Sequence, residues 1–578
     1  MIARVLKHWG NAVVLIVTAF MIFSGSSSGY AYSSTHPPLT ADSQIYIVGS
    51  GLAGLCAAAT AIQDAHVPGK NIHIFEQRKT LGGACEAQGG TGGQTYSSNG
   101  ARLYDPSVYK AYRKFLARIP SYDDQKEMVK LGNNNDYKVK KTLDNEFEEF
   151  SLSHPYDSKT RLVGKNQERI NHFDFGLSWR DRYDLIHLVL MDEEKTYNKR
   201  MDEYFSPHFF TTNLWYQWSS IFGFQQWHGL TEMRRYARKF YHVLPNIASL
   251  HDTAWSTQYT TYDSVIMPTV MWLQTQGVTF HSGCKVTDVD FKPTIDEKTV
   301  TGIHYLDNGA AKEIKVRDND FVLISNGSKV ADQTPGDTHN APKIERGKVG
   351  GDWTLWESMA RKQPGLGNPN AFTSSIEHSR FQVVSITSRG PLADLVNKFS
   401  KNKLMGEQHD IIFKDSPWQL WLYTHFQPYV RNQDKDVTIL SAVGLKWDKG
   451  DYVKKNMEDC TGEEILQEIC YQFGFMKEMP EILKTCDVTI TQMPYVSSQF
   501  LPRTNYDRPP VVPDRSTNLA FIGEFTEIPE ECVFLTTYSC KSAEIAIYTL
   551  LGVDKEVTPA YIPTHNLWYW IRNLYAIL

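Results

Sequence analysis

The sequence lacks the signatures of several common protein classes. Its eight cysteines are scattered, with no CxxC pair and no histidine at zinc spacing, so we assign no metal site. A disulfide framework is neither required nor excluded in a chain of 578 residues. The formal net charge of -5 gives no basic surface for a polyanion, so nucleic acid is not expected as a partner.

Long hydrophobic runs are also missing, except near the amino terminus. A basic flank at residues 4–8 precedes an apolar run at 12–23, and a small-x-small triplet follows at 29–31. These features predict a signal peptide. An uncleaved membrane anchor is the alternative, although the run is shorter than the roughly 20 residues that span a bilayer. Residues 1–40 are therefore expected to lie outside the fold, and the protein is expected in the secretory pathway or associated with a membrane.

A dinucleotide-binding fingerprint is the most informative motif present. A short β-branched run leads into Gly49-x-Gly51-x-x-Gly54 and then into an Ala-rich helical stretch. Gly49 permits the tight turn, Gly51 lets a diphosphate approach the backbone, and Gly54 allows close packing of helix and strand. The free N–H groups at the start of the helix would face the diphosphate. A second strand at 71–75 ends at Glu76, whose carboxylate is expected to bind the adenosine ribose.

Further glycine turns favour FAD over NAD as the nucleotide. A second glycine turn, at 81–83, follows Glu76. Two later strands end on Asn326-Gly327 and on Gly523-Glu524, and in flavoproteins such segments return the chain to the cofactor. The cofactor contacts predicted from these segments are Gly82, Gly83, Val286, Asn326, Gly327, Gly523 and Glu524. No second GxGxxG is present, so a dedicated NAD(P)H site is not expected.

The rest of the chain predicts further regions around this core. Residues 107–249 are dense in helix-forming and aromatic residues and predict a helical lid, in which four basic residues at 234–239 form either a solvated face or an anchor for an anion. Residues 346–509 are assigned to a substrate domain. The aromatic tail at 551–578 either docks on the core or lies on a membrane surface. The FAD-binding domain is predicted to be discontinuous, with segments 41–106, 250–345 and 510–550.

The predicted fold class is therefore α/β, with a Rossmann-type FAD-binding flavoprotein core, a helical lid or substrate domain and a carboxyl-terminal helical part.

Long blocks of the sequence resemble the oleate hydratase family, also called myosin-cross-reactive antigens. The matching blocks run in order through almost the whole folded chain and include GSGLAGL, LGG, GFQQWHGLTEMRRYARKF, QYTTYDSVIMP, GGDWTLWESMARKQPGLGNPNAF and NLAFIGEFTEIPEECVFLTTYS. The resemblance implies an FAD-dependent enzyme that adds water to a cis double bond of an unsaturated fatty acid, without net redox change. A membrane surface is a further expected partner, and a homodimer is considered.

The resemblance also assigns catalytic positions, one of which differs here. Hydration of an alkene needs an acid and a base. The family's proton-donating tyrosine corresponds to Tyr236, but the position of its water-activating glutamate is occupied by Arg102. Arginine stays protonated at any useful pH and cannot be a general base. Arg102 is therefore expected to bind an anion or to pair with Glu86 or Asp105, and either carboxylate is a candidate for the missing base.

Three functions remain open on this basis. The first is an FAD-dependent fatty acid hydratase with altered catalytic residues. The others are a flavin-dependent double-bond isomerase or oxidoreductase, and a catalytically silent lipid-binding flavoprotein. If the base is missing, oleate hydration should be weak and Arg102→Glu should raise it; if another carboxylate has taken over, wild-type activity should be substantial.

Overall fold

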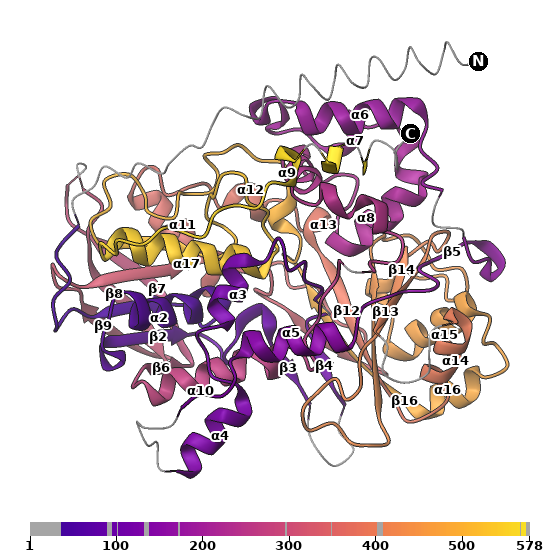
Figure 1. Ribbon diagram of the computed structural model, residues 1–578, viewed down its shortest axis with the longest axis horizontal. Coiled ribbons are helices and arrows are strands. Elements are labelled where there is room, and N and C mark those ends of the chain that lie inside the picture. Colours follow the sequence, from indigo (N-terminus) through magenta and orange to yellow (C-terminus); the bar gives the residue numbers. More distant parts are fainter. Residues whose placement is uncertain are drawn as a thin grey trace.

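The computed structural model describes residues 36–89, 95–100, 102–131, 138–170, 174–251, 253–294, 297–347, 350–401, 408–566, 568–570 and 572–573. The signal peptide or anchor predicted at the amino terminus lies outside the described residues. The described elements form two large sheets with helices around them (Figure 1).

A five-stranded parallel sheet forms the centre of one half of the molecule. Its strands, in spatial order, are β17 (Leu519–Ile522), β10 (Phe321–Ser325), β1 (Ile45–Val48), β2 (Ile72–Glu76) and β6 (Thr279–Ser282). Every neighbouring pair is parallel. The strands come from three separate parts of the chain, and the parallel sheet confirms the predicted α/β, Rossmann-type class.

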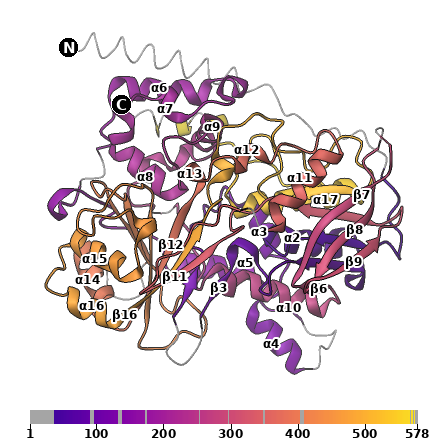
Figure 2. The same cartoon turned by 180° about the vertical axis from the view of Figure 1, so that it is seen from behind.

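Both faces of this sheet are covered, because successive strand residues point to opposite sides. Ile45 and Ile47 of β1 pack into one hydrophobic core, while Tyr46 packs into another. The helices on the first side are α2 (Leu52–Asp64), α3 (Lys110–Leu116), α10 (Met267–Thr275) and α17 (Thr536–Leu550). The second side carries α11 (Gly351–Lys362) and the antiparallel strands β7 (Cys284–Phe291), β8 (Val300–Asp307) and β9 (Ala310–Lys315), seen from behind in Figure 2.

A seven-stranded sheet forms the centre of the other half. Its order is β11 (Thr334–Asp337), β16 (Cys486–Met493), β12 (Phe381–Ser388), β15 (Thr438–Gly444), β14 (Leu420–Thr424), β13 (His409–Phe413) and β5 (Leu162–Val163). All neighbours are antiparallel except β13 and β5. A hydrophobic core joins it to α14 (Leu392–Ser400), α15 (Gly462–Phe473) and α16 (Met479–Thr485). Five of its strands lie within the predicted substrate domain.

The segment predicted as a lid is mostly helical. Its remaining helices are α4 (Tyr122–Lys130), α5 (Leu143–Ser153), α6 (Trp179–Leu190), α7 (Met201–Tyr204), α8 (Asn213–Phe222) and α9 (Leu230–Lys239). The short elements elsewhere are β3 (Ala87–Gln88), β4 (Ser97–Ser98), α12 (Asn370–Thr373) and α13 (Ile376–Ser379). The basic residues of α9 are not a solvated face, since Arg235 pairs with Glu193 and Glu527 and Lys239 pairs with Glu531.

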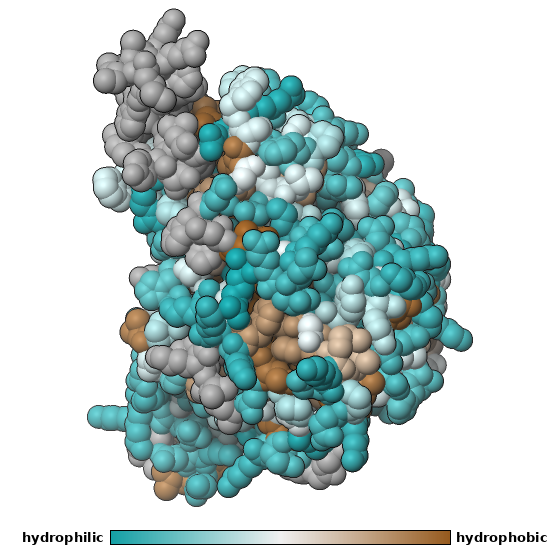
Figure 3. Space-filling model, turned by 90° about the vertical axis from the view of Figure 1, so that its right-hand side faces the viewer, coloured by the Kyte–Doolittle hydropathy of each residue, from teal (hydrophilic) through white to brown (hydrophobic). Residues whose placement is uncertain are grey.

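The described part of the carboxyl-terminal segment docks on the folded core. Trp570 is buried and packs against Tyr241 with the rings tilted, and the Arg572 side chain donates a hydrogen bond of 2.8 Å to the His242 carbonyl. Of the two alternatives left open for this tail, docking on the core is the one seen for these residues. Within the described ranges, no helix has the length and apolar character needed to cross a membrane. The face in Figure 3 is mostly polar, with a compact apolar area set into it.

Candidate functional site

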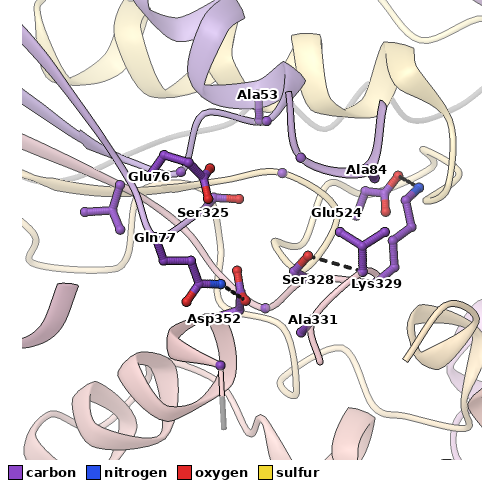
Figure 4. Close-up of a pocket in the computed structure, with 18 of the residues that line it drawn as sticks. Ala53, Glu76, Gln77, Ala84, Ser325, Ser328, Lys329, Ala331, Asp352 and Glu524 are labelled. Carbon is purple, nitrogen blue, oxygen red and sulfur yellow. Dashed lines mark hydrogen bonds and ion pairs between the residues drawn. The ribbon is translucent and has the colours of Figure 1, made fainter. Parts of the chain in front are cut away.

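A large cavity opens at the carboxyl ends of the parallel strands. It has a volume of about 420 Å³ and is lined by the residues that end β1, β2, β10 or follow β17, among them Val48, Glu76, Ser325 and Gly523. Figure 4 shows Glu76, Gln77 and Asp352 on one side of it and Lys329 and Glu524 on the other. In open parallel sheets this edge is where nucleotide ligands bind.

The glycines of the fingerprint meet two different requirements. Gly49 has a φ of +104°, and a Cβ on Gly54 would lie 2.1 Å from the Gly49 carbonyl oxygen, so both are needed by the turn itself. Gly51 has an ordinary φ of -65°, and a Cβ there would approach no atom closer than 3.9 Å. Gly51 and Gly83 both line the cavity, and their backbones lie against each other. The glycine at 51 therefore leaves space in the cavity that the fold does not need.

The start of α2 is suited to bind an anion. Gly51 is the N-cap of this 13-residue helix and gives no side-chain cap to the first N–H groups. These groups and the helix dipole favour a phosphate at this position. The arrangement fits the diphosphate of a dinucleotide.

Acidic side chains gather at one end of the cavity. Glu76 accepts hydrogen bonds from the Ser50 amide at 3.1 Å and from the Ser50 hydroxyl at 2.7 Å. Asp352, in the first turn of α11, accepts a hydrogen bond of 2.6 Å from the Gln77 side chain. Burial of the Asp352 carboxyl, together with the nearby charge of Glu76, raises its pKa to about 6. Glu76 lies at the end of β2, as the sequence predicted, while Asp352 and Gln77 were not identified, although a Gly-Gly-Asp step begins α11.

The opposite end of the cavity holds an ion pair. Lys329 Nζ lies 2.8 Å from Glu524 Oε1 and 4.3 Å from the centre of the Phe534 ring. Val286, Gly327, Gly523 and Glu524, predicted as cofactor contacts, line the cavity, and Lys329 is an addition from the structure. Gly82, Gly54 and Asn326 are not among the lining residues, and the Asn326 amide is buried without a hydrogen-bond partner in the described part of the chain.

A second, smaller cavity adjoins the first. It has a volume of about 110 Å³, and both cavities are lined by Arg102, Phe534 and Thr536. Most of its wall is apolar and comes from α8, from the residues after α9 and from the segment near 250, namely Ile221, Phe222, Phe240, Val243, Leu250 and Ala254. The same cavity contains two carboxylates, Asp105 and Asp410.

Arg102 lies at the junction of the two cavities. Its guanidinium donates hydrogen bonds to the Ala84 carbonyl at 2.5 Å and to the Gly100 carbonyl at 3.5 Å. No carboxylate among the described residues forms an ion pair with it. The prediction that Arg102 pairs with Glu86 or Asp105 is therefore wrong, because Glu86 lies 2.8 Å from Arg78 and Asp105 lies 2.6 Å from His242.

Two predicted catalytic residues lie away from both cavities. Glu86 accepts hydrogen bonds from Arg78, Thr80 and Gln88, which engage both of its carboxylate oxygens. Tyr236 is fully buried on α9, and its hydroxyl donates a hydrogen bond of 2.5 Å to the Val533 carbonyl. Neither side chain is among the residues that line the cavities. Proton donation by Tyr236 thus stays a prediction.

Comparison with known proteins identifies the family. Residues 42–548 match the model of the MCRA family. The chain is 30% identical over 564 residues to a protein named oleate hydratase from Streptococcus pyogenes serotype M49 (strain NZ131), covering 95% of this chain and 92% of that relative. It is 29% identical over 571 residues to a protein named linoleate hydratase from Lactiplantibacillus plantarum, covering 90% of this chain and 96% of the relative.

Among solved structures, an oxidoreductase from Methanosarcina mazei covers 87% of this chain and 99% of its own, with 11% identity and a TM-score of 0.47. The family match, in contrast, extends from before the first strand, β1, into α17. The chain belongs to the MCRA family.

Proposed function

We propose that the protein is an FAD-dependent fatty acid hydratase, which adds water to a cis double bond of an unsaturated fatty acid such as oleate. The observation that carries the proposal is the pair of adjoining cavities, one lined by glycines of the dinucleotide fingerprint and one mostly apolar, with Arg102 between them. The names of the two relatives, oleate hydratase and linoleate hydratase, support the substrate class.

The residues of the larger cavity fit FAD. The first turn of α2, with Gly51 and Gly83, would hold the diphosphate, and Glu76 would bind the adenosine ribose. Residues near Gly327, Gly523 and Glu524 would face the flavin half. When bound, the flavin would supply a ring system that stabilises positive charge developing on the alkene.

The protein's own side chains supply the remaining requirements. The apolar wall of the smaller cavity binds an acyl chain and excludes bulk water. Because an alkene has no polar group, contacts with this apolar wall are what orient it. Arg102 keeps its positive charge and offers five N–H donors, so it binds an anionic group at the junction rather than moving a proton.

The arginine at the family's glutamate position favours a second candidate, a lipid-binding flavoprotein that isomerises the double bond or leaves it unchanged. Product analysis separates the candidates. Purified protein with FAD and a reductant is incubated with oleic and linoleic acids, and the products are identified by mass spectrometry. A mass gain of one water supports the hydratase, a shifted double bond indicates an isomerase, and unchanged lipid with measurable binding indicates the silent protein.

The location and assembly of the protein are part of the same proposal. The basic and apolar residues at 4–23 support entry into the secretory pathway or association with a membrane, and a homodimer is proposed as the assembled form. Mass spectrometry of the mature amino terminus and light scattering of the purified protein test these two points.

A further inference from the structure

We infer that Asp105, held by His242, accepts the proton from the attacking water, in place of the glutamate that this chain lacks. The inference rests on the proposed hydratase function and concerns the smaller, apolar cavity. It starts from the two carboxylates that line this cavity.

Asp410 is fully occupied by other groups. It accepts hydrogen bonds from the Tyr156 hydroxyl at 2.5 Å, from Arg161 Nε at 3.0 Å and from Trp421 Nε1 at 3.1 Å. Arg161 is completely buried, so Asp410 neutralises a charge that would otherwise lie unpaired in the interior. Protonation of Asp410 would remove the negative charge that balances buried Arg161.

Asp105 is differently placed. One carboxylate oxygen lies 2.6 Å from His242 Nε2, and the other accepts a hydrogen bond of 2.9 Å from the Ser107 amide. No lysine or arginine of the described chain pairs with it. Each carboxylate oxygen can accept two hydrogen bonds, so Asp105 keeps capacity for a water in the cavity. It also lies three positions after Arg102, on the same segment that carries the family's glutamate position.

His242 is the positioning residue of this pair. It is buried directly after α9, and its Nδ1 atom has no hydrogen-bond partner among the described residues. Its ring centre lies 5.3 Å from that of Tyr561 and 5.7 Å from that of Tyr569, both in the carboxyl-terminal segment. Tyr561 and Tyr569 face the His242 ring, Arg572 contacts the His242 carbonyl, and Tyr109 and Arg102 line the same cavity as Asp105.

The proton transfers balance without an added reagent. The water oxygen forms the C–O bond while one of its O–H bonds breaks, and that proton passes to Asp105. An acid of the site delivers a proton to the other alkene carbon. Two hydroxyls of the cavity, those of Tyr109 and Tyr423, make no hydrogen bond with the described residues and are available for this step. The proton on Asp105 then returns to the acid through solvent, and nothing is oxidised or reduced.

The direct test is Asp105→Asn in the FAD-loaded enzyme. We expect kcat for hydration to fall by about 10²-fold or more, the size of a lost general base, while FAD content and KM change little. The matched control is Asp290→Asn on β7, because Asp290 Oδ2 also lies 2.6 Å from a histidine, His304 Nε2, but the Asp290 side chain is about half exposed and lines neither cavity. The control is expected to keep wild-type turnover.

Two histidine variants test the positioning role. His242→Leu removes the group that orients the carboxylate, so kcat should fall while KM and FAD content change little. His242→Gln keeps an N–H donor and should restore most of kcat. An unchanged kcat in His242→Leu, or a loss that His242→Gln does not restore, contradicts this role.

The outcomes separate this inference from the proposed function. If wild-type protein hydrates no unsaturated acid, the proposed function fails. If wild-type hydrates and Asp105→Asn retains its kcat, the inference is overturned. Should Asp105→Asn fail to bind FAD, Asp105→Glu keeps the charge but displaces the oxygens, and is expected to lower kcat by about tenfold or more; unchanged kcat would overturn the inference. Arg102→Glu should not raise hydration, and a clear rise would show that the base was missing.

Discussion

Gly51 and Gly54 belong to one fingerprint but are glycines for different reasons. A side chain at Gly54 would collide with the backbone of the turn, whereas a side chain at Gly51 meets only the cavity and Gly83. The first residue is therefore required by the fold, and the second is explained by a ligand that approaches the backbone.

This difference predicts a separation of folding from cofactor binding. Gly51→Val should give folded protein without bound flavin, because the valine would occupy the place of the diphosphate. Gly54→Val should fail to fold or melt far below wild type. Flavin absorbance of the purified protein and thermal unfolding of the apoprotein measure the two effects. Full flavin occupancy in Gly51→Val would show that the fingerprint does not hold FAD.

Tyr236 provides a test of the role transferred from the family. Its hydroxyl is buried and bonded to the Val533 carbonyl, so Tyr236→Phe leaves that carbonyl without its donor. We expect the free energy of unfolding to fall by about 1 to 3 kcal/mol, because the buried carbonyl loses its donor. Loss of turnover with unchanged stability would instead support proton donation by Tyr236, after a rearrangement that brings the hydroxyl to the cavity.

Asp352 predicts a pH dependence of stability. Its folded-state pKa of about 6 lies above the ordinary value of 3.8, so the folded protein holds the proton more tightly than the unfolded chain. The stabilising contribution is present below pH 3.8 and is lost as the pH rises through about 6. The free energy of unfolding of Asp352→Asn, relative to that of wild type, should therefore rise by up to about 3 kcal/mol from acidic to neutral pH.

Denaturant unfolding of the two apoproteins at several pH values measures this difference. The asparagine can still accept the hydrogen bond from Gln77, which keeps the local contact. A stability difference that does not change with pH would contradict the raised pKa.

The sequence predicted the residues of the site that follow one another along the chain. Gly49, Gly51 and Glu76 could be placed because a strand, a tight turn and a helix are local signals. Asp352 and Lys329 could not, since they reach the cavity only when distant segments pack on the sheet. His242 has no sequence signal at all, because its partnership with Asp105 depends on how α9 meets the segment before α3.

At the scale of elements, α9 is joined to the loop before β17 by buried charges. Glu232 of α9 lies 2.7 Å from Arg503 and 3.2 Å from Arg508, and all three side chains are completely buried. Burial alone would raise the pKa of Glu232, but Arg508 and Arg503 hold it below its ordinary value. The composition of α9 suggested a basic helix, and the arginines that pair with its Glu232 could not be foreseen because they come from a distant segment.

This network predicts a large loss of stability when its acid is removed. Glu232→Gln leaves two buried guanidinium groups partly unpaired, and we expect it to lower the free energy of unfolding by about 3 to 5 kcal/mol. Asp192→Asn is the control, since Asp192 pairs with Lys195 at the surface and should give no measurable change. Equal effects of the two substitutions in denaturant unfolding would contradict a structural role for the buried cluster.

At the scale of the whole molecule, three distant segments assemble one parallel sheet, and the chain between them builds the second sheet and the lid. The class of the fold could be predicted because β1, β10 and β17 are short, largely apolar runs that each lead into a glycine turn. The seven-stranded sheet could not be predicted from the sequence, because the order of its strands depends on pairing between remote strands such as β12 and β16. The two cavities meet where these parts join.

The measurement that tests the central claim most directly is the origin of oxygen in the product. The FAD-loaded protein is incubated with reductant and oleic acid in water enriched in oxygen-18. The account predicts a hydroxy fatty acid with one labelled oxygen, one double bond fewer than the substrate and no net consumption of reductant. A product with a shifted double bond and no label, or lipid recovered unchanged although it binds, would contradict it.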